Sequence, residues 1–204
     1  PPTYELDRLF IAIVESLEQT QPSSIAQQIH QRLRDASVSD QIFLERLQGP
    51  IYEENVGITR FILVRLAQEG MNNEKWTDLW ARQVVGQGQE QYRWTIEHIV
   101  PQGQNMPESW IEALGGEEKA SKFLQQEVHR LGNLTITGYN SALGNMTFVE
   151  KRDRKDSKEP YSYIGYKNGL ALNAELALRE SWKQEDVVAR TEQLSALASA
   201  LFQL

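Results

Sequence analysis

The chain has 204 residues, of which 40% are hydrophobic, 24% are charged and 9% are aromatic. This composition is that of a globular protein with one sizeable core or two small ones. The absence of cysteine excludes disulfides, thiolate zinc sites and a cysteine nucleophile. The formal net charge of −7 argues against nonspecific coating of nucleic acid, although a local basic patch can steer a phosphate backbone.

No apolar run approaches the length of a transmembrane helix, and no charged-then-apolar segment at the start reads as a signal peptide. These two features favour a cytoplasmic protein. The sequence begins at Pro1 rather than at a methionine, so we expect a fragment of a longer protein.

Apolar residues in the first ninety positions recur at the spacing of amphipathic helices. The stripe over residues 6–17 predicts one helix, which ends before Pro22. Asn72 and Asn73 are expected to cap a helix that carries two tryptophans. We predict that helix over residues 76–80, and the remaining helices of this half over residues 25–33, 42–47 and 58–66. The apolar stripes indicate the core of a helical bundle.

The pattern changes after residues 86–88, which read Gly-Gln-Gly. β-forming residues predict a strand over residues 92–100 that stops at Pro101, because proline cannot continue a central ladder. A loop rich in glycine, proline, asparagine and glutamine is expected over residues 102–116. A helix over residues 117–128 should follow it.

A second strand is predicted over residues 132–137. Asn140 and Ser141 are expected to cap a further helix that reaches Glu150. A last helix over residues 182–197 should dock back on the protein through its apolar positions. The sequence thus predicts a mainly α fold, a helical bundle with an inserted strand–strand–helix unit.

The chain contains three histidines, His30, His98 and His129. His30 lies among glutamines in the helical half and is expected at the surface. His98 directly follows Glu97 near the expected strand end. A neutral imidazole can take a proton from water, and a neighbouring carboxylate can hold a hard metal ion. Hydrolysis of a phosphodiester needs both a proton acceptor and a metal ion.

Each of these features also has a structural interpretation. Glu97 and His98 alone would fit an exposed salt-bridging pair at a strand end. Asn133 and Asn140 strengthen the catalytic interpretation, although asparagine also favours turns and helix caps. Residues 151–158 carry five basic and two acidic side chains, which suits either a phosphate contact or a solvated turn.

Four segments in this order resemble the HNH (His-Me finger, ββα-metal) nuclease domain of GmrSD-type restriction endonucleases, phage-defence proteins that attack modified DNA. The first segment is also similar to the HNH module of the RNA-guided CRISPR nucleases. The segments read E-H-I-V-P-Q at 97–102, H-R-L-G-N-L-T at 129–135, Y-N-S at 139–141 and F-V-E-K at 148–151. The resemblance implies a ββα-metal nuclease core over residues 91–156, between a helical subdomain (1–90) and a C-terminal helical segment (157–204).

The resemblance also implies roles for individual residues. His98 would be the general base, and Glu97 and Asn140 would hold a divalent metal beside it. Asn133 would fix the loop and orient the histidine. Substrate contacts, or the shaping of the site, would come from His129, Lys151 and Arg152. Glutamate and asparagine replace the commoner aspartate and histidine, and their oxygen atoms favour Mg²⁺ or Mn²⁺ over zinc.

The function that follows from the resemblance is metal-dependent hydrolysis of DNA, with each site nicking one strand, in the effector domain of an anti-phage restriction protein. The implied partners are DNA and an N-terminal nucleotide-hydrolysing, DNA-sensing domain. The present sequence contains no phosphate-binding loop of the G-x-x-x-x-G-K type. The alternative is a non-catalytic helical interaction module with a degenerate site. RNA as the substrate also stays open, because the phosphate chemistry is shared.

Overall fold

The computed structural model describes residues 3–18, 20–72, 76–138, 143–157, 159 and 161–203. The chain divides into two compact units. The first comprises Pro1–Phe43 and Phe202–Leu204, and the second comprises Leu44–Leu201. The subdomain limits expected after residues 90 and 156 both fall inside the second unit and stay predictions.

The first unit is built from α1 (Thr3–Leu17) and α2 (Ile25–Ala36), joined by the short 3₁₀ turn η1 (Pro22–Ser24). Both helices confirm the sequence prediction. The prediction that the α1 stripe forms core is wrong for most of its members. Ile13 is buried, but Phe10 is 55% exposed. The apolar positions of α2 are only half-buried, and α2 contributes no fully buried residue, so the two helices form no closed core.

The second unit is mainly helical, with two small antiparallel sheets. The helix α3 (Asp40–Gln48) begins in the first unit and ends in the second. The other helices of the second unit are α4 (Ile51–Glu54), α5 (Val56–Gln68), α6 (Glu108–Leu114), α7 (Glu117–Gln126), α8 (Phe148–Arg152), α9 (Ala174–Leu178) and α10 (Gln184–Leu201). Its strands and 3₁₀ turns are β1 (Arg82–Val85), β2 (Gln89–Tyr92), β3 (Trp94–His98), β4 (Leu134–Gly138), η2 (Leu131–Asn133) and η3 (Ala171–Asn173). The periodic stretches that become α3, α5, α7 and α10 confirm the predictions made for them.

Three local predictions are wrong. The helix expected over 76–80 is absent, and the hairpin β1–β2 follows instead, turned by Gly86 and Gly88 at positive φ. The loop expected over 102–116 contains α6, because Trp110 is buried in the core and holds that segment as a helix. The helix near residue 150 is capped by Thr147 rather than by Asn140 and Ser141, which lie outside the described residues.

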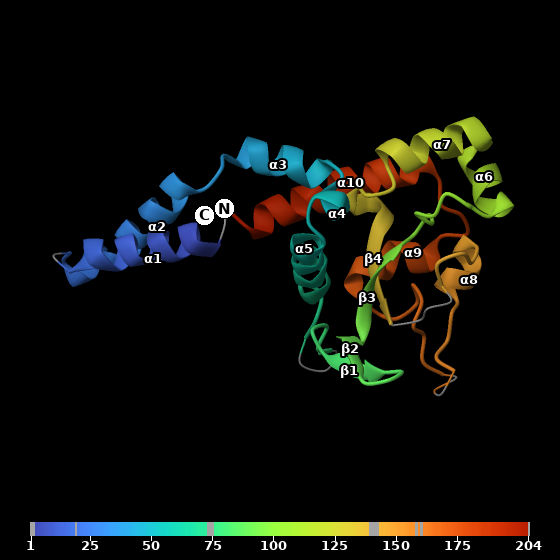
Figure 1. Cartoon of the computed structure of the whole chain (residues 1–204), viewed down its shortest axis with the longest axis horizontal. Coiled ribbons are helices and arrows are strands. Elements are labelled where there is room, and N and C mark those ends of the chain that lie inside the picture. The colour runs from blue at the N-terminus through green and yellow to red at the C-terminus, as the bar shows by residue number, and fades with distance from the viewer. Residues whose placement is uncertain are drawn as a thin grey trace. The chain divides into compact units, whose positions relative to one another are not determined.

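The strands β3 and β4 pair in antiparallel register, from Trp94 opposite Gly138 to His98 opposite Leu134. Figure 1 shows the two strands side by side, with the β1–β2 hairpin next to the start of β3. All of β4 is buried, whereas β3 is half-buried until it reaches the buried His98. Large side chains around the strand end form one hydrophobic cluster that includes Trp110, Phe123, Phe148, Tyr166 and Trp182. This cluster packs around the residues at the end of β3.

Throughout the described ranges, no helix combines the length and the apolar character that crossing a bilayer requires.

Candidate active site

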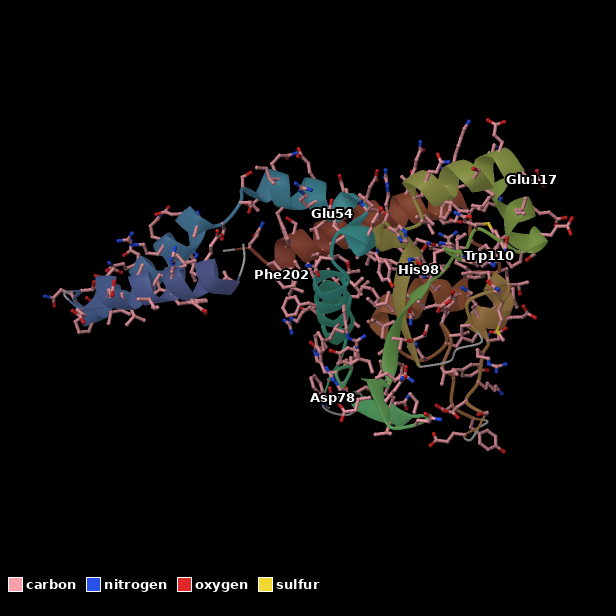
Figure 2. The ribbon with its side chains drawn as sticks, in the orientation of Figure 1. Glu54, Asp78, His98, Trp110, Glu117 and Phe202 are labelled. Carbon is pink, nitrogen blue, oxygen red and sulfur yellow. The ribbon has the colours of Figure 1, made fainter. Side chains whose placement is uncertain are left out.

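The candidate site lies where β3 ends. Glu97 and His98 are the last two residues of the strand, and the next two residues are fully buried before the chain reaches Pro101. Because neighbouring side chains of a strand point to opposite faces, the pair takes different partners. Glu97 binds Lys151, whereas His98 contacts His129. In Figure 2, His98 lies toward the end of β3 that is farther from Asp78.

His98 is held in an aromatic cluster. Its Nε2 lies 3.3 Å from Nδ1 of His129, and it is only 7% exposed. The ring of Tyr52 meets the His98 ring edge-on at 4.6 Å and stacks on the His129 ring at 5.6 Å. The backbone N–H of Tyr52 also donates to the carbonyl of His129. Tyr52 was missed by sequence analysis, since a tyrosine 46 residues from His98 carries no local signal.

Burial decides the protonation state of His98. It lowers the pKa of His98 to about 3, with smaller contributions from nearby His129 and the Lys151 cation. The imidazole is therefore neutral near neutral pH, which is the state that a proton acceptor requires.

Lys151 lies inside the protein beneath Glu97. Its Nζ donates to Oε1 of Glu97 and to the carbonyl of His98, both at 2.7 Å, and to the carbonyl of Ile99 at 3.1 Å. These bonds use all three donors of the ammonium group. The Lys151 side chain is fully buried, and that of Glu97 is 14% exposed. Burial raises the pKa of Glu97 and lowers that of Lys151, and the ion pair opposes both shifts.

Arg152 is also engaged within the protein. Its guanidinium bonds both carboxylate oxygens of Asp153, the carboxylate of Glu180 and the carbonyl of Arg179. The hydrogen bonds to Asp153 and then Glu180 raise the pKa of Arg152. The two basic residues that were expected near the substrate thus have internal partners in this structure.

Asn133 joins the two segments that carry the histidines. Its side-chain carbonyl accepts from the N–H of Val100 at 2.8 Å, and its amide donates to the carbonyls of Val100 and Val128 at 3.0 and 2.9 Å. Val100 follows His98 by two residues, and Val128 precedes His129 directly. A fully buried amide with three such bonds fixes both segments relative to each other.

The expected metal ligands are only partly visible. Glu97 is described, whereas Asn140 lies outside the described residues. Within the ranges that the structure describes, no three acidic or histidine side chains gather as a metal site would require. Glu97 is thus the one expected ligand whose surroundings are known.

A comparison with known families bears on this arrangement. Residues 37–197 match the model of the GmrSD restriction endonucleases, C-terminal domain. The chain belongs to this family. Membership in the GmrSD family implies a nuclease, and hence a hydrolase, that acts on DNA. The match starts just before α3 and so leaves out α1 and α2. None of the curated proteins and none of the solved structures matches the chain.

Proposed function

We propose that this GmrSD-type domain is an HNH endonuclease that hydrolyses DNA phosphodiester bonds with His98 as its general base. The observation that carries the proposal is a neutral imidazole at the end of β3, held by His129 and Tyr52 and next in the chain to the largely buried Glu97. Family membership supplies the class of reaction. The order of β3, β4 and α8, with α8 tied to β3 by Lys151, supports the proposal of a ββα-metal motif.

The contact between the two histidines supports a choice of the nitrogen of His98 that takes the proton. A neutral imidazole has one N–H donor and one nitrogen acceptor. If Nε2 of His98 donates to Nδ1 of His129, then Nδ1 of His98 is left to accept a proton. The water oxygen attacks the phosphorus, its proton moves to Nδ1 of His98, and the bond to the leaving oxygen breaks. His129 and Tyr52 act as positioning residues in this scheme.

Substrate charge adjusts the strength of the base. With a pKa of about 3, the buried His98 of the free protein is a weak proton acceptor. A phosphodiester anion beside the ring favours the charged imidazolium and so raises the pKa of His98. The base therefore becomes stronger when DNA is in place.

Glu97 and Asn140 are the residues that would hold a divalent ion. Both supply hard oxygen ligands, which suit Mg²⁺ or Mn²⁺. Lys151 bonds one oxygen of Glu97, so among the described residues the second oxygen of this 14% exposed side chain is left for an ion, which would share the carboxylate with the ammonium group. Such an ion, when bound, would neutralise the negative charge that develops on the leaving oxygen.

Lys151 and Arg152 act as positioning residues in this proposal. Lys151 fixes the backbone of His98 and Ile99 as well as the carboxylate of Glu97. Arg152 ties the end of α8 to Glu180. Their internal partners favour this role over the phosphate contact expected from the sequence.

The resemblance extends the proposal to the biological setting. We infer that the chain is the effector part of a longer anti-phage protein whose N-terminal domain hydrolyses nucleotide and senses DNA. A full-length protein whose DNA cleavage did not depend on nucleotide would contradict this arrangement. The net charge of −7 favours the second candidate function, a non-catalytic helical module with a degenerate site.

Cleavage of supercoiled plasmid separates the two candidates. We expect the wild-type chain to nick the plasmid with Mg²⁺ or Mn²⁺ and to be silent with chelator. His98→Ala should lower the rate by about 10²- to 10⁴-fold, the usual contribution of a general base. His30→Ala, which alters an exposed histidine of α2, is the matched control and should cut like the wild type.

Either contrary result is informative. Cleavage by His98→Ala at the wild-type rate would remove His98 from the mechanism. A folded wild-type chain that never cuts would favour the degenerate site, or an effector that is inactive without its sensor domain.

A further inference from the structure

A pocket that the proposed hydrolysis does not use opens beside His129 and has a volume of about 570 Å³. One wall is a face of α7 that carries Ser121, Leu124 and Gln125 at helical spacing. The opposite wall comes from the segment after β3 and includes Gln102. The volume lies within the range of roughly 300 to 1,000 Å³ that is typical of small-molecule sites.

The pocket adjoins the proposed base. His129 lines it, and Nδ1 of His129 lies 3.3 Å from Nε2 of His98. Gln102 follows His98 by four residues and belongs to the same chain segment. A group bound here would lie next to the phosphate that the water activated by His98 attacks.

The lining disfavours a phosphate ligand and favours a neutral one. No lysine or arginine is among the described residues that line the pocket, and Glu117 lines it at the start of α7. Met106 and Val128 contribute buried apolar surface. A phosphate would find no cation here, whereas a flat ring would find an apolar contact surface.

The amide side chains in the wall are free to bind. Within the described part of the chain, Gln102, Gln104 and Gln125 make no side-chain hydrogen bond. An amide offers both a donor and an acceptor, and glutamine can pair with two adjacent atoms of an adenine edge. Donors and acceptors together are what the edge of a nucleobase requires.

We propose that this pocket binds one nucleobase of the DNA, turned out of the base stack beside the phosphate that is cut. The inference rests on the proposed nuclease function and deepens it. Gln102, Gln104 and Gln125 contact the edge of the base, while Met106 and Leu124 contact its face. Pockets that receive an extruded base combine these two kinds of contact.

Two neighbouring glutamines of α7 give a matched pair of variants. Gln125 lines the pocket, whereas the side chain of Gln126, the last residue of the same helix, does not. We expect Gln125→Leu to lower kcat/KM for DNA cleavage about tenfold, the usual cost of one lost amide–base pair. Gln126→Leu should cut like the wild type. Ser121→Phe, which fills the pocket from an exposed helix position, should lower kcat/KM at least as much.

A fluorescent base reports on extrusion without cleavage. Duplexes would carry one 2-aminopurine, placed in turn at each position flanking the cut mapped for the wild-type chain. Binding of the His98→Ala full chain should raise the fluorescence at one position, because the base leaves the stack. The double variant His98→Ala, Ser121→Phe should bind with no such rise.

The results separate this inference from the function on which it rests. His98-dependent cleavage with no fluorescence rise at any position, and with equal rates for Gln125→Leu and Gln126→Leu, overturns the base pocket alone. That result would assign the groove to another ligand, such as a polypeptide. A folded chain that neither binds nor cuts DNA overturns both proposals.

Discussion

At the scale of single residues, the core cluster beneath the site contains buried polar atoms without a hydrogen-bond partner among the described residues, including those of Tyr166 and Trp182. The hydroxyl of Tyr166 is buried, and it has no hydrogen bond within the described part of the protein. Burial, with a smaller contribution from the Glu97 carboxylate, raises the pKa of Tyr166 well above its usual value. A buried hydroxyl without a partner costs free energy, so Tyr166 lowers the stability of the fold relative to a phenylalanine.

Tyr166→Phe tests this cost. Near neutral pH, the free energy of unfolding should be unchanged or raised by up to about 2 kcal/mol. Above about pH 10, unfolded tyrosine loses its proton while folded Tyr166 keeps it. The folded state then binds more protons, so the wild type loses stability as pH rises and the variant loses less. Urea unfolding at both pH values measures the difference.

The matched control for this prediction is Tyr161→Phe, at a tyrosine that is 96% exposed. It should change neither the stability nor its pH dependence. A loss of more than about 1 kcal/mol in Tyr166→Phe would mean that the hydroxyl has a bonding partner in solution.

At the scale of elements, the site depends on how β3 is joined to the turn after α7. Asn133, in η2, bonds the segment that follows His98 and the segment that precedes His129. Arg190 of α10 donates to the carbonyls of Gly132 and Leu134 on either side of this residue. Separate elements thus hold one short turn, and the distance between the two histidines follows from that turn.

Asn133→Ala removes three buried hydrogen bonds at once. The groups left unpaired at Val100 and Val128 should lower the free energy of unfolding by at least about 2 kcal/mol, measured by urea denaturation. Cleavage should fall with it, because the histidines lose their spacing. Asn145→Ala changes an exposed turn asparagine and should leave both quantities unchanged. Equal stability of the two variants would contradict the role assigned to Asn133.

At the scale of the whole molecule, the buried apolar side chains are distributed very unevenly between the two units. Among the described residues, Ile13 is the single buried hydrophobic side chain before residue 44. Every other one belongs to the unit that holds the candidate site. The family match likewise begins at residue 37. The helices α1 and α2 therefore contribute little to the stability of the second unit.

Removal of residues 1–36 should leave the thermal unfolding of the remaining chain within about 4 °C of the intact protein, which corresponds to roughly 1 kcal/mol at this size. Calorimetry provides the measurement. Removal of residues 184–204, which include all of α10 with its buried Val187 and Leu194, should abolish cooperative unfolding. A drop of more than about 8 °C in the first truncation would show that the core extends into α1 or α2.

Local patterns in the sequence predicted many of the elements. The helices α2, α5 and α10 repeat apolar residues at helical spacing over several turns. This spacing is a local property of the sequence, so it predicts these helices without knowledge of their partners. The hairpin β1–β2 was not predicted, since its four-residue strands are rich in glutamine. The helix α6 was missed because a single buried tryptophan, Trp110, outweighs the loop-forming residues around it.

The sequence by itself identified the family and singled out Glu97 and His98 as the proposed catalytic pair, because both are carried by short stretches of neighbouring residues. Only the tertiary structure decided their partners. His129 lies 31 residues from His98, and Lys151 lies 54 residues from Glu97. Whether a basic side chain faces solvent or a buried carboxylate depends on the packing of distant segments. The interior position of Lys151 was for that reason beyond any local pattern.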